Sequence, residues 1–178
     1  MANGAMTSNN KGEKNVREFM VNNQMIDCIV RLPDKLFLTT GIPACIFILS
    51  KNRDDKDGQH RKRTNKILFI DTSKMGTMES RKLRVFTDAD IEKVADTYHA
   101  WRNIGRTYEN TDGYSYNATL EEVQKQDYKL TPGIYVGTEE VEDDGIAFED
   151  KMEALKTQLQ FTKGNELQQK ILENFDRV

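Results

Sequence analysis

The chain has 178 residues, of which 37% are apolar and 31% are charged, and its mean hydropathy is −0.71. This length suits one hydrophobic core and argues against a second large domain. The net charge of −3 and the pI of about 5.5 argue against a stand-alone nucleic-acid-binding protein, which usually carries a strongly basic surface. They do not exclude one subunit of a larger DNA complex, because a partner can supply that surface.

The N-terminal segment 1–19 has no apolar run and no small-residue cleavage site, so no signal peptide is predicted. No apolar run approaches the roughly 20 residues that span a bilayer, so we expect a cytoplasmic protein without membrane contact. Cys28 and Cys45 lie within apolar segments and are expected to be buried thiols. Neither they nor His60 and His99 have a spacing that suits a metal site or a catalytic pair.

The first predicted elements are a helix and three buried strands. The helix ends near Asn23 and carries apolar residues at helical spacing: Val16, Phe19 and Met20. The strands are short apolar runs rich in β-branched residues: 25–33, 43–51 and 66–71. The basic stretch His60 to Arg63, between the last two, could contact phosphate, but the acidic DDKD before it favours a solvated loop. This order of elements favours an α/β sheet over a helical bundle.

A second amphipathic helix is predicted to begin after Thr87, an N-cap candidate three residues before Asp90. His99 lies beside its apolar face and is interpreted as a surface or core-rim histidine instead of a catalytic base. A capping box from Thr119 to Glu122 predicts a shorter helix after an extended segment. The apolar face of the second helix comprises Ile91, Val94, Ala95, Tyr98 and Trp101.

The composition changes after Gly137, where an acidic linker is followed by a narrow apolar seam. A seam of this kind suits one partner helix, so we expect a tail that docks another subunit. The alternative is a tail that folds back on its own domain. The predicted division is a domain of residues 1–138 and a linker with a helical tail of residues 139–178. The seam residues recur at steps of four, three and four: Phe148, Met152, Leu155 and Leu159.

Six segments cover nearly the whole chain in one order: ANGAMTSNNKGEKNVREFM, IDCIVRLPDKLFLTTGIPACIFILSKNR, KILFID, DIEKVADTYHAWR, ATLEEVQKQDYKLTPGIYVG and EDDGIAFEDKMEAL. Together they resemble the modification (methyltransferase) subunit of type I DNA restriction-modification systems, the N-6 DNA methylase family. The resemblance implies the C-terminal strands and helices of a Rossmann-like sheet, followed by a helical tail. It also implies adenine-specific DNA methylation, with S-adenosylmethionine (SAM) as the methyl donor of the complete subunit.

Two motifs of that family are missing from this chain: the glycine-bearing cofactor loop and the Asn-Pro-Pro-Phe tetrapeptide, both upstream of ANG. We therefore expect no catalytic residue, cofactor-binding residue or metal ligand in this chain, and no activity from it alone. The resemblance implies DNA, the specificity subunit, the restriction subunit and the missing N-terminal half as partners. Open strand edges would also favour self-association. The alternative functions are a non-enzymatic module that binds the specificity subunit and a truncated relic without a role.

The segment KLFLTTGIPA resembles the strand-turn-strand that presents an aromatic ring to the flipped base in related adenine methyltransferases. Phe37 falls at the aromatic position, and Leu36 is the alternative. Phe37 could instead fill the core at the end of the sheet, and the turn could be only a turn, with glycine allowing positive φ. On the functional interpretation, the turn residues also approach the base: Thr39, Thr40 and Gly41.

Overall fold

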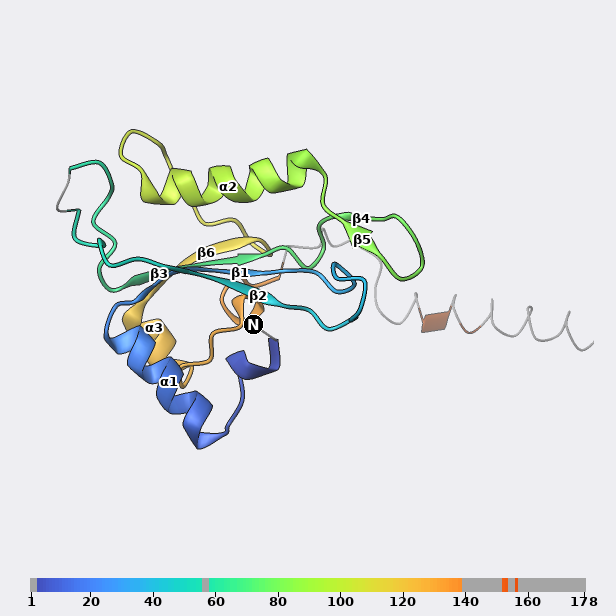
Figure 1. Cartoon of the computed structure of the whole chain (residues 1–178), viewed down its shortest axis with the longest axis horizontal. Coiled ribbons are helices and arrows are strands. Elements are labelled where there is room, and N and C mark those ends of the chain that lie inside the picture. The colour runs from blue at the N-terminus through green and yellow to red at the C-terminus, as the bar shows by residue number, and fades with distance from the viewer. Residues whose placement is uncertain (1–2, 56–57, 139–151, 154–155, 157–178) are drawn as a thin grey trace, which may run out of the picture. The chain divides into compact units, whose positions relative to one another are not determined.

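The computed structural model describes residues 3–55, 58–138, 152–153 and 156, which fall in two compact units, 1–139 and 140–178. In the first unit, four strands form one mixed sheet in the order β2-β1-β3-β6 (Figure 1). The two inner strands are parallel, and each outer strand is antiparallel to its neighbour. The strands are β1 (Ile26–Arg31), β2 (Cys45–Leu49), β3 (Lys66–Asp71) and β6 (Ser115–Thr119).

Helices cover both faces of this sheet. Helices α1 (Lys11–Asn22) and α3 (Leu120–Lys125) lie on one face, and α2 (Asp88–Arg102) lies on the other (Figure 1). Among the described residues, no helix is long and apolar enough to cross a bilayer. The smaller elements are the 3-10 helices η1 (Asn3–Met6) and η2 (Pro132–Ile134) and the short hairpin of β4 (Thr77–Met78) and β5 (Arg84–Val85).

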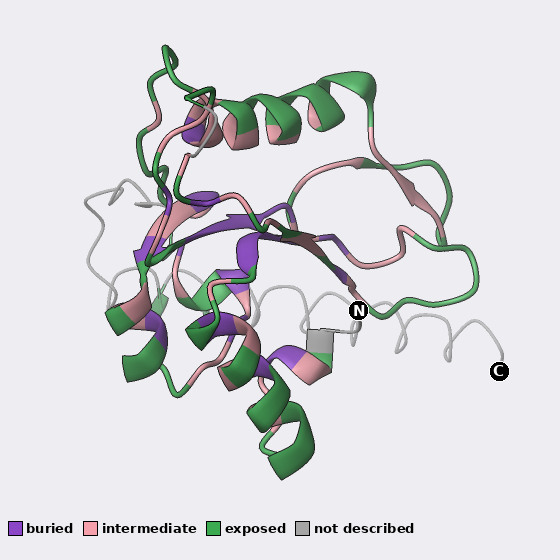
Figure 2. Cartoon of the chain, turned by 60° about the vertical axis from the view of Figure 1, so that its left-hand side comes forward, coloured by how far each residue is buried: buried purple, intermediate pink, exposed green. Residues whose placement is uncertain are grey.

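The core has two layers because alternate residues of each strand point to opposite faces of the sheet. Phe69 of β3 is buried on the α1 side, where its ring stacks on Tyr135 at 4.0 Å between centroids. Leu68 and Ile70 point to the other side and pack with Trp101 of α2. The buried residues accordingly follow the strands, while the outer surface of α2 is exposed (Figure 2).

The predicted capping box at Thr119 is confirmed, and the predicted N-cap Thr87 forms a second capping box. The hydroxyl of Thr87 accepts a hydrogen bond from the amide of Asp90 at 3.2 Å, and Thr119 accepts from Glu122 at 3.3 Å. In return the carboxylates accept from the amides of the two threonines. The hydrogen bonds from Thr87 lower the pKa of Asp90, because they stabilise its charged form.

The predicted apolar face of α1 is confirmed only for Met20, which packs against the core. Val16 and Phe19 are 55% and 61% exposed, whereas Arg17 and Val21 are buried. The guanidinium of Arg17 reaches main-chain carbonyls outside its own helix, including that of Ala5 at 2.8 Å. Three such bonds satisfy a buried arginine, which a periodicity argument treats as solvent-facing.

The predicted apolar faces of α2 and of the second strand are only partly buried. Ile91 is 54% exposed on α2, and Trp101 is the residue of that helix that the core buries. The 43–51 segment was expected to be a buried strand, but β2 lies at the end of the strand order, and its Ile46 and Leu49 are 48% and 53% exposed. An edge strand buries less of itself because one side of its ladder has no neighbour.

Gly76 is required by the hairpin between β3 and α2. Its φ is +80°, and a Cβ there would lie 2.8 Å from the carbonyl oxygen of Val85. Gly105 has a similar φ of +83° but open space around its Cβ position. We expect Gly105→Ala to cost about 1–2 kcal/mol of unfolding free energy from backbone strain alone. Gly76→Ala should cost about 1–3 kcal/mol more from the clash. Equal urea midpoints for the two variants would show that Val85 moves aside freely.

Candidate functional site at the carboxyl edge of the sheet

The carboxyl ends of β1 and β3 meet at one edge of the sheet because these strands run parallel. Ligands of open α/β sheets bind outside this edge. An ion pair joins the two strand ends, with Nη1 of Arg31 3.0 Å from Oδ2 of Asp71. The next residue, Thr72, donates from both its amide and its hydroxyl to the carbonyl of Arg31, at 3.0 and 2.5 Å. The point where the chain leaves β1 is therefore fixed.

The 3-10 helix η2 packs closely over this ion pair. A Cβ on Gly133 would lie 3.1 Å from Oδ2 of Asp71 and 3.2 Å from Nη1 of Arg31. Both distances are tighter than ordinary contacts, so glycine lets the main chain approach the charged groups. The 3-10 helix η2 thus covers the ends of the two strands.

Residues 36–42 form a loop on the segment that follows β1, and we call it the 36–42 loop. Its base is tied to the β4–β5 hairpin, since the amide of Arg84 donates to the carbonyl of Lys35 at 2.9 Å. At its tip the amide of Thr40 donates to the carbonyl of Phe37 at 3.2 Å. The Thr40 hydroxyl accepts from the amide of Ile42 at 3.1 Å. These bonds give the tip a defined turn.

The 36–42 loop presents apolar side chains to solvent. Phe37 and Leu38 are 46% and 76% exposed, and Phe37 belongs to neither buried core cluster. Leu36, in contrast, packs against the cluster on the α2 face. An exposed aromatic ring on a hydrogen-bonded turn offers a flat face to a ligand at little cost to the fold.

A second constellation, buried inside the sheet, was not predicted. The β1–β2 pairing shifts by one residue between Ile26 and Cys28, so a bulge carries Asp27. Asp27 is fully buried, and its Oδ1 lies 3.0 Å from Nε of Arg63 and 3.3 Å from Nε of Arg53. We call these three residues the Asp27 cluster. It joins β1 to the loop of residues 52–65.

The surroundings of the Asp27 cluster satisfy most of its polar groups. Tyr98 of α2 donates to Oδ2 of Asp27 at 2.8 Å, and burial raises the pKa of that phenol. Burial also lowers the pKa of Arg53, while Asp27 opposes the effect. Arg63 is 1% exposed and lies over the ring of Trp101 at 5.7 Å. The prediction of a solvated loop is therefore wrong for Arg63, whose partner lies 36 residues earlier in the chain.

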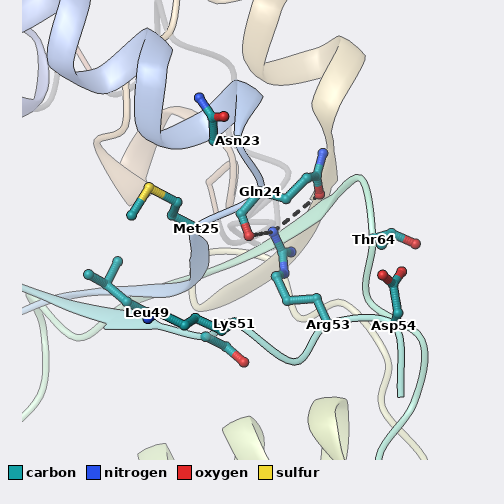
Figure 3. A pocket seen from close by; sticks show the side chains of 9 residues that line it. Asn23, Gln24, Met25, Leu49, Lys51, Arg53, Asp54 and Thr64 are labelled. Atoms are coloured by element: carbon teal, nitrogen blue, oxygen red, sulfur yellow. Dashed lines mark hydrogen bonds between the residues drawn. The ribbon is translucent and has the colours of Figure 1, made fainter. Parts of the chain in front are cut away.

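A hollow of about 490 Å³ lies beside this cluster, where α1 ends and the 52–65 loop begins (Figure 3). Arg53 enters it and donates to the main-chain and side-chain oxygens of Gln24 at 3.2 and 3.3 Å. Its other terminal nitrogen donates to the carbonyls of Arg63 and Lys66. The guanidinium therefore ties the loop to the sheet.

Comparison with known protein families identifies the family to which this chain belongs. The model of the family described as N-6 DNA Methylase matches residues 1–144. The chain belongs to the N-6 DNA methylase family. The α/β fold predicted from the sequence is confirmed by a solved relative, the type I restriction-modification system methyltransferase subunit from Streptococcus thermophilus. That subunit is 30% identical to this chain with a TM-score of 0.62, over 76% of this chain and 25% of its own.

Curated N-6 DNA methylases with similar sequences belong to type I restriction enzymes. The HindI methylase subunit of Haemophilus influenzae is 44% identical over 98% of this chain and 38% of its own length. The MjaIX methylase subunit of Methanocaldococcus jannaschii is 32% identical over 100% of this chain and 31% of its own. The chain thus spans about a third of the length of each of these two curated relatives.

The predicted site residues of this chain fall in two places. Phe37, Thr39, Thr40 and Gly41 all lie on the 36–42 loop at the carboxyl edge. Of the tail seam, Met152 lies in a helical stretch of the second unit and is 37% exposed. The other three seam residues, Phe148, Leu155 and Leu159, lie outside the described residues.

The two cysteines of this chain are buried, and the two histidines lie on α2 or in contact with it. Both thiols are buried, which raises the pKa of Cys45 to about 11 and that of Cys28 well above its usual value. His60 contacts Nη2 of Arg102 through Nε2 at 2.9 Å and so ties the 52–65 loop to the end of α2. His99 is exposed on α2, as predicted. Among the described residues, no cluster of His, Cys, Asp or Glu side chains is placed to hold a metal ion.

Proposed function

We propose that the chain forms part of an adenine-specific DNA methyltransferase, the modification subunit of a type I restriction-modification system. The family match over residues 1–144 is the observation that carries this proposal. The complete subunit transfers a methyl group from SAM to the exocyclic amine of adenine, and the chain by itself is inactive. DNA, a specificity subunit and a restriction subunit are the proposed partners.

The chemistry of adenine explains the role proposed for the 36–42 loop. The exocyclic amine is a poor nucleophile because its lone pair is delocalised into the ring, and the enzyme reaches it by flipping the base out of the duplex. Flipping costs a few kcal/mol of lost stacking and pairing. The exposed ring of Phe37, on a turn anchored to the carboxyl edge, is suited to stack on the flipped base. Its neighbours Thr39, Thr40 and Gly41 would bring the main chain close to the same base.

SAM provides the methyl group when it is bound to the complete subunit. The residues proposed here act on the base alone: Phe37 provides a stacking face, and the turn holds that face at a fixed angle. The Arg31–Asp71 ion pair and the bonds from Thr72 position the loop at the strand end. No proton transfer is assigned to a residue of this chain.

We also propose that the tail after residue 138 contacts another subunit. The seam of Phe148, Met152, Leu155 and Leu159 recurs at the spacing of a helix that packs on one partner helix. The proposed partner is the specificity subunit. Deleting the residues after Thr138 should leave the sheet folded and abolish co-purification with that subunit. Unchanged co-purification would remove the docking role.

The test of the function is a chimera in which this chain replaces the matched segment of the HindI methylase subunit. With the HindI specificity subunit, the chimera should transfer a labelled methyl group from SAM to adenine N6 of duplex DNA. The 178-residue chain alone should show no SAM binding tighter than about 100 μM in calorimetry. Tight binding by the chain alone, or a folded chimera that assembles without methylating, would contradict the proposal.

A further inference from the structure

The β4–β5 hairpin carries positive charge next to the 36–42 loop. From Lys74 to Arg84 the sequence has four basic residues and one acidic residue, Glu79, although the whole chain has a net charge of −3. The hairpin and the 36–42 loop lie at the same end of the sheet (Figure 1). The proposed function gives the hairpin no role beyond anchoring that loop. Basic side chains gathered at this one place on an acidic chain suit an anionic ligand.

Hydrogen bonds give the tip of the hairpin a defined turn. The amides of Glu79 and Ser80 donate to the carbonyl of Leu83 at 3.0 and 3.2 Å. The Ser80 hydroxyl accepts from the amides of Lys82 and Leu83 at 3.3 and 3.1 Å. The turn therefore holds Arg81 and Lys82 together at the end of the hairpin.

The basic residues of the hairpin differ in what they contact. Nη1 of Arg84 donates to two main-chain carbonyls of the hairpin at 3.1 and 3.2 Å, and its Nη2 lies 3.6 Å from Oδ1 of Asp34. Arg84 thus stabilises the hairpin itself. Arg81 and Lys82 are exposed, and within the described part of the chain neither side chain has a hydrogen bond or an ion pair. These two charges are available to a ligand.

A base that reaches the 36–42 loop brings phosphates with it. A flipped nucleotide stays joined to its strand, so a phosphate lies on each side of the extruded base. The amide of Arg84 donates to the carbonyl of Lys35, next to the loop, at 2.9 Å. This bond fixes the hairpin beside the place proposed for the base. Contacts from arginine and lysine to phosphate are what position a protein on DNA.

We propose that Arg81 and Lys82 bind phosphates of the target strand beside the flipped adenine. The hairpin would then hold the strand while Phe37 stacks on the base. This inference rests on the proposed function and names a second contact of the same site with DNA. An acidic surface of the specificity subunit is the competing occupant, and the bond between the hairpin and the base of the 36–42 loop favours DNA over it.

The salt dependence of DNA binding tests the two charges. The HindI chimera, assembled with the HindI specificity subunit, is titrated with duplex DNA at several salt concentrations. Each lost phosphate contact lowers the slope of log affinity against log salt by about 0.9. Joint replacement by Arg81→Ala and Lys82→Ala should therefore lower the slope by about 1.8 and weaken binding by roughly tenfold or more at about 0.1 M salt.

Two control variants belong to this titration. Lys62→Ala removes the same charge from an exposed position on the 52–65 loop, at the other end of β3 (Figure 1). Its slope should equal that of the unmodified complex, and a fall as large as that of the hairpin variant would overturn the inference. Arg81→Lys keeps the charge and should keep the slope. A loss equal to that of Arg81→Ala would contradict a role as a phosphate-binding charge.

Single neutral methylphosphonates in the target strand show which phosphates are bound. Beside the target adenine, such a replacement should weaken binding of the unmodified complex by about eightfold at 0.1 M salt. The same replacement should not weaken the double variant further, because the contact is already lost. If the double variant responds as strongly as the unmodified complex at every position, the inference is overturned.

The remaining outcomes separate this inference from the proposed function. If the chimera methylates DNA but the hairpin variants keep the full slope, the phosphate contact is wrong and the function stands. If the slope falls as described but the chimera does not methylate, the function fails and the contact stands. Loss of co-purification of the double variant with the specificity subunit would assign the hairpin to a protein partner and overturn the inference.

Discussion

Replacing Asp27 by asparagine is expected to lower the free energy of unfolding by about 3–5 kcal/mol, because it leaves two buried guanidinium groups without a counter-charge. Arg53 and Arg63 are 4% and 1% exposed, and both face Oδ1 of the fully buried Asp27. Asparagine has nearly the same shape and keeps one acceptor, so the loss measures the charge and not a cavity. A loss of this size is a large share of the 5–15 kcal/mol that stabilises a typical domain.

The surface pair Asp96–Arg106 provides the matched control for this substitution. Its Oδ1–Nη1 distance is 3.0 Å, the same as the Oδ1–Nε distance between Asp27 and Arg63, but its side chains are 71% and 53% exposed. Solvent screens exposed pairs, so Asp96→Asn should barely move the urea midpoint. Comparable losses for the two asparagine variants would show that water reaches the Asp27 cluster in the folded protein.

Tyr98→Phe separates the hydrogen bond from the ion pairs within the Asp27 cluster. The phenol donates to Oδ2 of Asp27 at 2.8 Å, and a hydrogen bond to a charged group contributes about 1.5–3 kcal/mol. The phenylalanine variant should therefore be intermediate between the unmodified chain and Asp27→Asn in urea denaturation. This order follows from the geometry, since only the aspartate contacts both arginines.

The Asp27 cluster also shows why part of this structure could not be predicted. Asp27 stands inside the apolar run MIDCIV, and a carboxylate at such a position is rarely buried without a partner. The sequence therefore contained a signal that a positive partner was needed. Nothing near Arg63 identifies it as that partner, because its neighbours are charged and the contact spans 36 residues. Local charge patterning therefore led to the wrong prediction that Arg63 faces solvent.

Elements determined by local chemistry were predicted well. Three strands follow from short apolar runs, and two helices begin at the capping threonines Thr87 and Thr119. The order of the strands in the sheet could not be predicted in this way, because it depends on which distant segments pair with each other. The partial exposure of β2 follows from its edge position, which the apolar run Pro43 to Lys51 does not reveal.

The 36–42 loop could be predicted in its position along the chain but not in the exposure of its side chains. Its place after β1 follows from the sequence, but the exposure of Phe37 depends on how the neighbouring segments pack. Leu36 packs against the α2-side cluster and leaves the aromatic ring 46% exposed. This arrangement favours a stacking role for Phe37 over core filling, since a core residue would be buried before any ligand arrives. The two roles differ most sharply in how they couple stability to methylation.

Phe37→Ala in the complete subunit is expected to slow methylation of duplex DNA by roughly tenfold to a hundredfold. Stacking of a base on an aromatic side chain contributes about 1–3 kcal/mol, and each 1.36 kcal/mol corresponds to a factor of ten in rate. The melting temperature should barely change, because the ring is not buried in the fold. Leu38→Ala is the matched control on the same turn, since Leu38 is 76% exposed and lacks an aromatic face. It should methylate at the unmodified rate.

Two further measurements decide the role of the ring. Phe37→Trp should retain activity, because the stacking face survives the substitution. The loss caused by Phe37→Ala should shrink when the target adenine is mismatched, because extruding an unpaired base costs less and depends less on the ring. A core-filling role gives the opposite pattern. Phe37→Ala would then lower stability by about 3–5 kcal/mol, and mismatched DNA would restore nothing. Melting temperature and methylation rate, measured together on paired and mismatched duplexes, therefore distinguish stacking on the flipped base from packing at the end of the sheet.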